Sequence, residues 1–400
     1  MKNEQRKREI ESYLFSGIDI SNYDKISGLE YKNNIDLFKR NYDSSESLEE
    51  LANEFINKWE EIFNQYSKKY KNLVIPISGG LDSRLILASA LNYYNAHNIQ
   101  TFTFGTESSF DYDFGNIVAK KAGTKHLKIN LKNIDPKLLI YNDSFIQGSS
   151  NFLGFPPIKI LRDNLDMSVP IVSGLMGDPL FGSHYQDINK NQIKNVILKK
   201  ENNGSNFSLF PELLEKYKLA FLEETNPTKF KNIEEWDINY RQKNFVMSQV
   251  LYKDFIYEAP FLDKTIISMS EKINAKFLKK SRGFHEILIN SKFNEFFSLP
   301  TKNYLGSGIP KDTFTRMKYI LMRGLFSRIK TLKGNKMKNY YFDEKLILLN
   351  MKENILKKID YVMESKIISS KYLFRIRNSF IDSINSDPNF FKLLLGLKED

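Results

Sequence analysis

Short apolar runs rich in β-branched and aromatic residues alternate with helical segments between residues 72 and 131. Because parallel strands need long crossover connections, a strand–helix–strand–helix–strand order at this spacing predicts right-handed βαβ units and a parallel sheet. We therefore predict an α/β fold, with a doubly wound parallel sheet followed by a mostly helical C-terminal part. The predicted strands are residues 72–77, 100–104, 126–131 and 169–173, and the predicted helices between them are residues 83–94 and 111–122.

A further helix is predicted just before the first strand. Ser47 and Glu50 have the spacing of a capping box, and apolar residues then recur at three- and four-residue steps up to about Tyr70. Pro76 is expected near the end of the first strand, because proline cannot donate to the ladder of a central strand. Asp111 is the candidate N-cap of the helix that follows the second strand. The chain is expected to divide into an N-terminal extension, a main domain and a basic helical region, at residues 1–44, 45–310 and 311–400.

The chain of 400 residues contains no cysteine and only four histidines. Disulfide staples, thiolate metal sites and cysteine nucleophiles are therefore excluded, and a zinc enzyme is not expected, because no two histidines stand at ligand spacing. The first eleven residues carry charge without an apolar stretch, and no apolar run approaches the ~18 residues that a membrane span needs. We expect a cytoplasmic protein that does not interact with a membrane.

The formal net charge of +11 is unevenly distributed. Residues 311–338 contain nine basic side chains and one acidic side chain, Asp312, and so contribute +8. Two interpretations are open: this segment meets an anionic substrate, a polyanion or an acidic partner, or it is a solvated helix face. Phe314, Tyr319 and Phe326 have the spacing of a buried helix stripe rather than that of a base-stacking platform.

The turn after the first strand has the residues of an anion-binding loop. It reads Ser78-Gly-Gly-Leu-Asp-Ser83 and opens a helix. Gly79 and Gly80 allow a tight turn and the close approach of a ligand, while the two serines and the first helical N–H groups present donors at the positive end of the helix dipole. A carboxylate beside phosphates, Asp82, is useful there if it holds Mg²⁺. The loop matches neither the Walker motif nor the dinucleotide fingerprint, and the alternative is an ordinary glycine-rich turn.

This loop resembles the pyrophosphate loop of enzymes that split ATP into AMP and pyrophosphate. Further segments, in order, narrow the resemblance to the synthetase domain of the asparagine synthetase family. Among them, residues 173–182 resemble the SGEGADELFGG motif, residues 259–263 resemble the R-x-PFLD motif, and residues 299–310 resemble a late LP…R-x-K-x-x-F stretch. Residues 101–105 and 111–126 resemble the second strand and the following helix and strand. The resemblance implies an adenine-nucleotide α-hydrolase-like fold of the ATP pyrophosphatase type.

The same resemblance implies a role for each matching residue. Asp82 and Asp178 would hold Mg²⁺, and Lys302 would stabilise the negative charge that develops when an amine attacks an acyl-adenylate. Asp178 and Lys302 are thus the implied catalytic residues. The residues implied to bind ATP are Ser78, Gly79, Gly80, Leu81, Asp82 and Ser83 at the pyrophosphate, and Phe104, Gly105, Ser173 and Gly174 at the adenosine.

The chain also departs from the family pattern. Position 2 is a lysine, no cysteine exists, and about 70 residues precede the first strand, so we expect no glutaminase domain. Leu175 and Pro179 replace two glutamates, and Glu258 replaces the arginine of the R-x-PFLD motif, which predicts an altered substrate. Glu258 is expected to form a structural charge pair, and the alternative is a contact with the substrate. His126 and His184 are expected to be structural, whereas Arg84 either reaches a phosphate or carboxylate or lies on a helix surface.

The resemblance as a whole implies a stand-alone, Mg·ATP-dependent ligase that adenylates a carboxylate, releases pyrophosphate, and transfers the acyl group to an amine with release of AMP. The amine would be free or supplied by a separate amidotransferase, and the basic segment is consistent with an acidic partner. One alternative is a tRNA-modifying enzyme; the missing cysteines and the PFLD segment argue against it, so nucleic acid is not an expected partner. Another is a non-catalytic scaffold, against which the intact loop and Asp178 argue.

Overall fold

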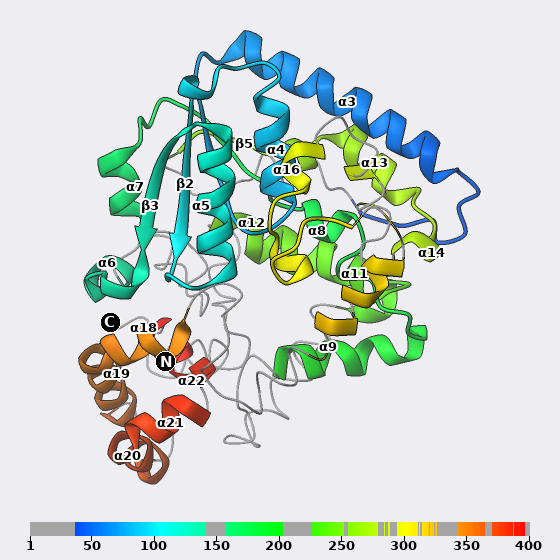
Figure 1. Ribbon diagram of the computed structural model, residues 1–400. Coiled ribbons are helices and arrows are strands. Elements are labelled where there is room, and N and C mark those ends of the chain that lie inside the picture. The colour runs from blue at the N-terminus through cyan, green and yellow to red at the C-terminus, as the bar shows by residue number, and fades with distance from the viewer. Residues whose placement is uncertain are drawn as a thin grey trace.

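The computed structural model describes residues 37–140, 157–202, 226–251, 255–278, 284, 287–288, 294–310, 312, 314–319, 321–323, 325, 343–364, 370–386 and 388–396. A five-stranded, fully parallel sheet in the order β3-β2-β1-β4-β5 lies at their centre, with helices on both faces (Figure 1). This confirms the predicted α/β class and the doubly wound sheet. The strands are β1 (Leu73–Pro76), β2 (Ile99–Gly105), β3 (Lys125–Asn130), β4 (Ile171–Val172) and β5 (Tyr257–Glu258).

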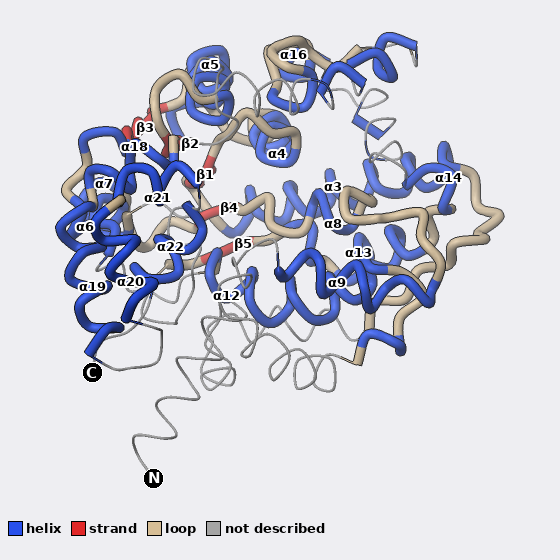
Figure 2. Tube along the Cα trace, turned by 90° about the horizontal axis from the view of Figure 1, so that it is seen from below, coloured by secondary structure: helices blue, strands red, loops and turns tan. Residues whose placement is uncertain are grey.

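Both faces of the sheet are apolar and covered. Successive residues of a strand point to opposite faces, so Leu73 and Ile75 join one apolar cluster and Val74 joins a second. Figure 2 shows the helices after β1 and β2 on one side of the strands and the C-terminal helices on the other. The first cluster includes residues of α3 (Leu48–Lys69), α4 (Asp82–Ala90), α5 (Phe110–Ala122) and α13 (Lys264–Glu271). The second includes residues of α7 (Ile158–Asn164), α18 (Glu344–Asn350), α19 (Lys352–Glu364), α20 (Ser370–Asn378), α21 (Phe380–Ser386) and α22 (Pro388–Gly396).

The winding of the chain creates a switch point between β1 and β4. The crossovers through α4 and α5 cover one face of the sheet, whereas the crossover through α7 covers the other, and β1 pairs with both β2 and β4. In open α/β sheets, ligands bind outside the carboxyl ends of the strands at such a point. The loop at 78–83 and the segment from Ser173 follow these two strand ends directly.

Several predicted boundaries move in the structure. The capping box of α3 is present as predicted, with Ser47 accepting from Glu50, and β1 ends at Pro76. The helix predicted over 83–94 ends at Ala90, and the strand predicted over 169–173 keeps only two residues. The N-cap position of α5 is Ser109, so the prediction that Asp111 caps this helix is wrong. β5 was not predicted, because a two-residue strand leaves no periodicity to detect.

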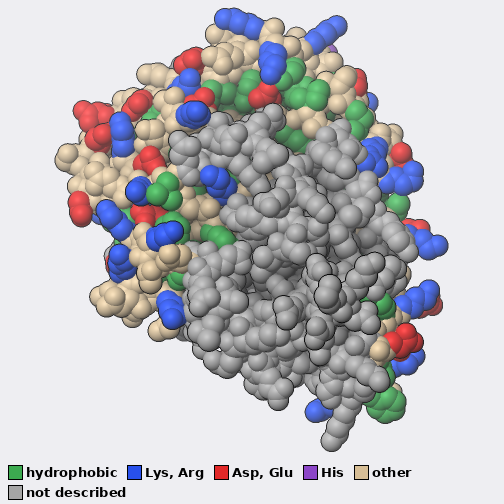
Figure 3. All heavy atoms as spheres, turned by 180° about the vertical axis from the view of Figure 1, so that it is seen from behind, with side chains coloured by type: hydrophobic (Ala, Val, Ile, Leu, Met, Phe, Trp, Pro, Cys, Tyr) green, Lys and Arg blue, Asp and Glu red, His purple; other side chains and the backbone are tan. Residues whose placement is uncertain are grey.

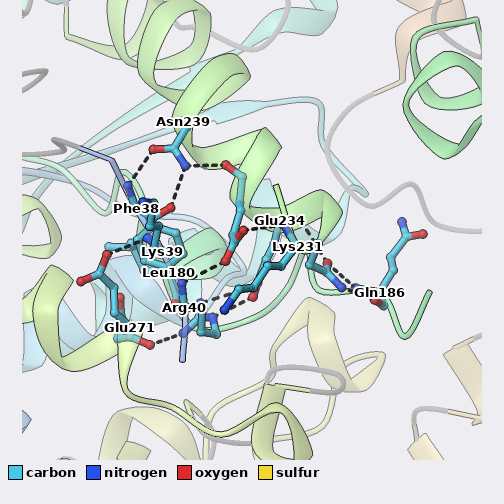
Figure 4. A network of polar contacts seen from close by, with 12 residues as sticks. Phe38, Lys39, Arg40, Leu180, Gln186, Lys231, Glu234, Asn239 and Glu271 are labelled. Carbon is cyan, nitrogen blue, oxygen red and sulfur yellow. Dashed lines mark hydrogen bonds and ion pairs between the residues drawn. The ribbon is translucent and has the colours of Figure 1, made fainter. Parts of the chain in front are cut away.

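Residues 37–44 lie against the main domain through a buried polar network (Figure 4). The Arg40 guanidinium donates to Glu234 Oε1 over 2.7 Å and to the carbonyl of Leu180 over 2.9 Å, and both charged side chains are fully buried. The Arg40 amide donates to Glu235. Because Leu180 ends α8 (Gly177–Leu180) and Glu234 lies in α11 (Ile233–Trp236), the network braces the turn that carries Asp178. The domain boundaries at residues 44 and 310 remain predictions.

The C-terminal helices are anchored at the loop that follows β2. The Asp343 amide, just before α18, donates to Thr106 Oγ1 over 2.7 Å. In the basic segment, Phe314 is 82% exposed, which contradicts the predicted buried stripe. Tyr319 packs edge-on against Tyr304. Phe326 lies outside the described residues. The reason is that residues 314–319 turn Arg316, not Phe314, inward.

On the face in Figure 3, the described Lys and Arg side chains are interspersed with Asp and Glu. Most of residues 311–338 lie outside the described residues, so both interpretations of that segment remain predictions. No helix in the described ranges is long and apolar enough to cross a bilayer.

The remaining helical elements of the described residues are short. They are η2 (Ala96–Asn98), η3 (Leu131–Asn133), α6 (Pro136–Ile140), η6 (Lys190–Gln192), α9 (Ile193–Asn202), η8 (Pro227–Lys229), the π-helix η9 (Asp237–Val246), α12 (Met247–Val250), η10 (Pro260–Leu262), α14 (Ala275–Leu278), α16 (Asn294–Phe297) and η12 (Lys302–Tyr304).

Candidate active site

The loop between β1 and α4 is a tight turn held by its own hydroxyl groups. The Ser78 amide donates to Ser83 Oγ over 3.3 Å, and the Gly80 amide donates to Ser78 Oγ over 3.1 Å. The two serines predicted to bind pyrophosphate therefore also shape the loop. The amides and hydroxyls lie at the start of α4, where the helix dipole favours an anion.

The carbonyl of Gly79 fixes a distant segment against this loop. It accepts from Thr301 Oγ1 over 2.9 Å and from the Lys302 amide over 3.1 Å. More than 220 residues separate the partners. Lys302 is thereby brought next to the loop, as the resemblance implies.

Arg84 is buried, so the interpretation that it lies on a helix surface is wrong. Its guanidinium donates to the carbonyls of Phe296 and Leu299 over 3.2 and 3.1 Å, and also to those of Pro300 and Gly79. Burial lowers the pKa of Arg84 to about 10, with an opposing effect from Asp111. Because its two terminal nitrogens donate to backbone carbonyls, Arg84 ties α4 to the segment that precedes Lys302.

Lys302 forms an ion pair inside the site. Its Nζ donates to Asp111 Oδ2 over 3.0 Å, and both side chains are largely buried, with 20% and 13% exposed. The other oxygen, Asp111 Oδ1, accepts from the Gly79 amide over 2.9 Å. Asp111 is thus a site residue that the sequence analysis missed. It lies after the carboxyl end of β2, at the edge where the site residues gather, and this position was the available signal.

The two predicted metal carboxylates belong to adjacent turns. The Asp178 amide donates to Asp82 Oδ2 over 3.1 Å, while Asp82 Oδ1 is shielded from solvent and has no hydrogen-bond partner. Burial, followed by the negative charge of Asp178, raises the pKa of Asp82 well above its usual range. The Asp178 amide and the Lys302 charge act in the opposite direction.

Gly177 allows the two turns to approach so closely. A Cβ at Gly177 would lie 2.6 Å from Asp82 Cγ, and one at Gly174 would lie 3.1 Å from Asp82 Cβ. The residue before Gly177, Met176, is buried and has a φ of 74°. The close approach leaves no room for any side chain at position 177.

These residues fit a magnesium ion shared with phosphates. Mg²⁺ in nucleotide sites is usually held by one or two carboxylates together with phosphate oxygens and water. Asp82 and Asp178 supply such a pair, and the unpartnered Asp82 Oδ1 is an oxygen that a cation would satisfy. Among the described residues, no group of three or more His, Asp or Glu side chains is arranged to hold a metal, so the site would need the phosphates.

The residues implied to bind adenosine follow the ends of β2 and β4. Phe104 is partly buried, and Gly105 has a φ of 149°, which favours glycine. The Ser173 amide donates to the Glu258 carbonyl over 2.8 Å, so β5 supports this strand end. Gly174 lies against Asp82. The adenosine and pyrophosphate residues thus occupy the same edge of the sheet.

Leu175 and Pro179, at the positions where the family pattern has glutamates, contribute to packing. Leu175 packs against the first apolar cluster, and Pro179 is buried within α8. Glu258 accepts from Lys69 Nζ over 3.0 Å and from the Tyr70 hydroxyl, so it forms the structural charge pair that was favoured.

Both histidines of interest have structural partners. His126 bonds to Thr101 Oγ1 and Asn116 Oδ1, each over 2.9 Å, and burial lowers its pKa to about 4. His184 bonds through Nδ1 to the buried Asp237 over 2.6 Å. Asp237 also accepts from Arg241. The expectation that both are structural agrees with these contacts.

Comparison with known proteins identifies the domain that carries this geometry. Residues 70–239 match the family model described as asparagine synthase. A search of curated proteins found no match. The matched segment contains the 78–83 loop, the end of β2, Ser173 and Asp178, whereas Lys302 lies beyond it. Residues 70–239 are therefore an asparagine synthase-type synthetase domain, with the ATP-binding function that this family implies.

Proposed function

We propose that this protein is an ATP-dependent amide-forming ligase that adenylates a carboxylate and passes the acyl group to an amine. The observation that carries the proposal is the convergence of the 78–83 loop, the Asp82–Asp178 pair and Lys302 at one edge of the sheet. A phosphate cradle, two carboxylates and one ammonium group are the set that adenylation and acyl transfer require.

The chemistry has two steps. A substrate carboxylate oxygen attacks the α-phosphorus of ATP, the bond to pyrophosphate breaks, and an acyl-adenylate forms. The amine then attacks the acyl carbon, AMP leaves, and the amine loses a proton. Asp82 and Asp178 would hold Mg²⁺, which supplies charge neutralisation for the departing pyrophosphate. Lys302 would stabilise the oxyanion of the second step, and a preorganised charge in a partly buried site is effective in that role.

The substrate is proposed to differ from aspartate. Leu175 and Pro179 are apolar and packed, so two carboxylates of the family pattern are missing beside Asp178. Glu258, in place of an arginine, pairs with Lys69 and Tyr70 and is not available to recognise a substrate carboxylate. The amine is proposed to be free or to come from a separate amidotransferase.

The test combines nucleotide binding with a substrate screen. Mg·ATP binding is measured by calorimetry on the full chain and on Asp82→Asn, and pyrophosphate release is measured over a panel of carboxylates with ammonia or amines. We expect binding that is lost in the variant, and AMP plus pyrophosphate from at least one acid. The Lys39→Met variant is the control, because the Lys39 residue is exposed and its contact with Glu271 is made by the amide, which the substitution keeps.

Each other outcome has a distinct meaning. Failure of the wild-type chain to bind Mg·ATP would reject the ligase in favour of a scaffold. Rapid formation of asparagine from aspartate would reject the altered substrate while keeping the reaction class. A salt-sensitive complex with tRNA, together with pyrophosphate release on tRNA alone, would move the assignment to RNA modification.

A further inference from the structure

Asp111 uses both of its carboxylate oxygens inside the candidate site. Oδ1 accepts from the Gly79 amide over 2.9 Å, and Oδ2 accepts from Lys302 Nζ over 3.0 Å. The carboxylate lies in the first turn of α5, where capping is the usual use of such a side chain, yet the cap position is Ser109. Asp111 therefore connects two elements that are far apart in the sequence.

Gly79 is held on both of its sides as a result. The Gly79 amide donates to the Asp111 carboxylate, and the Gly79 carbonyl accepts from two donors of the segment that carries Lys302. A Cβ at Gly79 would lie 2.8 Å from the Phe110 carbonyl and 3.2 Å from Asp111 Cα, so α5 is packed directly against the loop. The loop peptide, the start of α5 and Lys302 therefore form one rigid unit.

The position of the Lys302 ammonium follows from this unit. A Cβ at Gly80 would lie 3.7 Å from Lys302 Cε and 3.9 Å from Nζ, which places the end of the lysine beside the second glycine of the loop. A lysine side chain has four rotatable torsions, and fixing it in one geometry costs rotamer entropy. A charge-assisted hydrogen bond to a largely buried carboxylate offsets that cost.

A carboxylate next to a pyrophosphate site by itself disfavours the binding of pyrophosphate, because like charges repel. Its presence is therefore explained if its effect on Lys302 outweighs the repulsion. This reasoning rests on the proposed function. We propose that Asp111 is a positioning residue that holds Lys302 over the pyrophosphate loop, so that loop and lysine act on phosphates together.

The sign of the effect makes the proposal testable. Affinity for Mg·pyrophosphate is measured by calorimetry on the full chain, on Asp111→Asn, on Lys302→Met and on the double variant. Asn keeps the size of the side chain and an acceptor for Gly79 but removes the charge that holds Lys302. We expect Asp111→Asn to weaken binding by about tenfold, and to cause no further loss in the Lys302→Met background, because coupled residues are non-additive.

Asp113→Asn is the matched control, since Asp113 lies two residues on in the same helix and accepts from the Ser108 amide over 3.2 Å. It should bind Mg·pyrophosphate like the wild type. A second readout needs no ligand: the rate at which an amine-acylating reagent modifies Lys302, followed by mass spectrometry, should rise several-fold in Asp111→Asn and stay unchanged in Asp113→Asn.

The proposal would be overturned if Asp111→Asn bound as tightly as the wild type or more tightly, since simple charge repulsion predicts that result. An equal loss in the presence and absence of Lys302, or an unchanged labelling rate, would overturn it as well. Failure of the proposed function looks different, because the wild-type chain would then bind neither Mg·ATP nor Mg·pyrophosphate.

Discussion

Asp82 has one carboxylate oxygen bound to the Asp178 amide and a second that is buried without a partner. In the metal-free protein this carboxylate loses hydration and faces the charge of Asp178, and both effects disfavour the folded state. Asp82→Asn should therefore raise the free energy of unfolding of the metal-free protein at neutral pH by about 1 kcal/mol. Urea denaturation with and without Mg²⁺ measures the effect.

Magnesium should make the wild type more stable than Asp82→Asn, which is the reverse of the order expected without metal. Millimolar Mg²⁺ with pyrophosphate is expected to stabilise the wild type and to leave Asp82→Asn unchanged, because a ligand stabilises only the protein that binds it. A variant that is less stable than the wild type without metal would contradict the assigned cost of the carboxylate.

Gly177 provides a graded steric test of the same contact. In Gly177→Ala the new methyl would lie 2.6 Å from Asp82 Cγ, whereas in Gly174→Ala it would lie 3.1 Å from Asp82 Cβ. We expect Gly177→Ala to weaken Mg·ATP binding at least about tenfold, with a smaller loss for Gly174→Ala, because a 1 Å displacement of a positioned group is costly. Calorimetry, after thermal melting has shown both variants to be folded, gives the ranking. Equal affinities would place the two turns further apart than described.

At this scale, residue identity predicted which residues lie together in some cases and missed others. Asp82 and Ser83 lie in the predicted loop, because glycines and polar residues directly after a strand favour a tight turn, while their roles in binding stay predictions. Asp111 was misassigned because a carboxylate at the start of a helix looks the same whether it caps the helix or pairs with a lysine nearly 200 residues away. Met176 could not be foreseen either, since a buried methionine in the left-handed region is held by tertiary contacts.

The pairing of β3 with α5 and β2 depends on a neutral histidine. His126 in β3 bonds to Thr101 in β2 and to Asn116 in α5, and burial, with a contribution from Lys128, lowers its pKa to about 4. The unfolded chain has a histidine pKa near 6.5, so between these values the unfolded state binds the extra proton. Stability is therefore fully present above about pH 6.5 and falls as the pH drops toward 4.

We expect this histidine to account for about 1–3 kcal/mol of acid destabilisation, after allowance for its partial exposure. His126→Gln should lose less stability than the wild type between pH 7 and pH 4.5, as measured by urea denaturation at both values. His97→Gln, at an exposed position just before β2, is the control and should behave like the wild type. An identical pH dependence in all three proteins would show that another group titrates.

Element type was easier to predict than element length. α3 was predicted closely because its capping box and apolar spacing are local. β4 and β5 have two residues each, and their pairing depends on the neighbouring strand rather than on their own sequence. The parallel direction of the strands follows from connection rules, but the strand added by residues 257–258 could not be inferred from them.

The described part of the chain is held together by contacts between segments far apart in sequence. Arg40 and Glu234 are 194 residues apart and form a fully buried ion pair, and Arg40 also binds the ends of α8 and α13. Arg40→Met should lower the free energy of unfolding by about 3–5 kcal/mol, because it leaves the Glu234 charge buried without its partner. Chemical denaturation of the full chain gives this value.

The double variant Arg40→Met/Glu234→Gln should recover part of the loss, since the second change removes the uncompensated charge. Lys39→Met is the control, because the Lys39 side chain is exposed and its contact with Glu271 is made by the amide. No local pattern around residues 37–44 predicted these contacts, since the partners of Arg40 lie between 140 and 230 residues away.

The chain order of the site residues has a consequence for synthesis of the protein. The loop that starts at Ser78 leaves the ribosome long before Lys302, which pairs with Asp111 beside that loop. At ordinary rates of 5–20 residues per second the interval is roughly 10–45 s. During that time a nascent chain presents the loop without the lysine and its supporting Thr301, so the contacts of these two residues with Gly79 and Asp111 form only after all five strands have been synthesised.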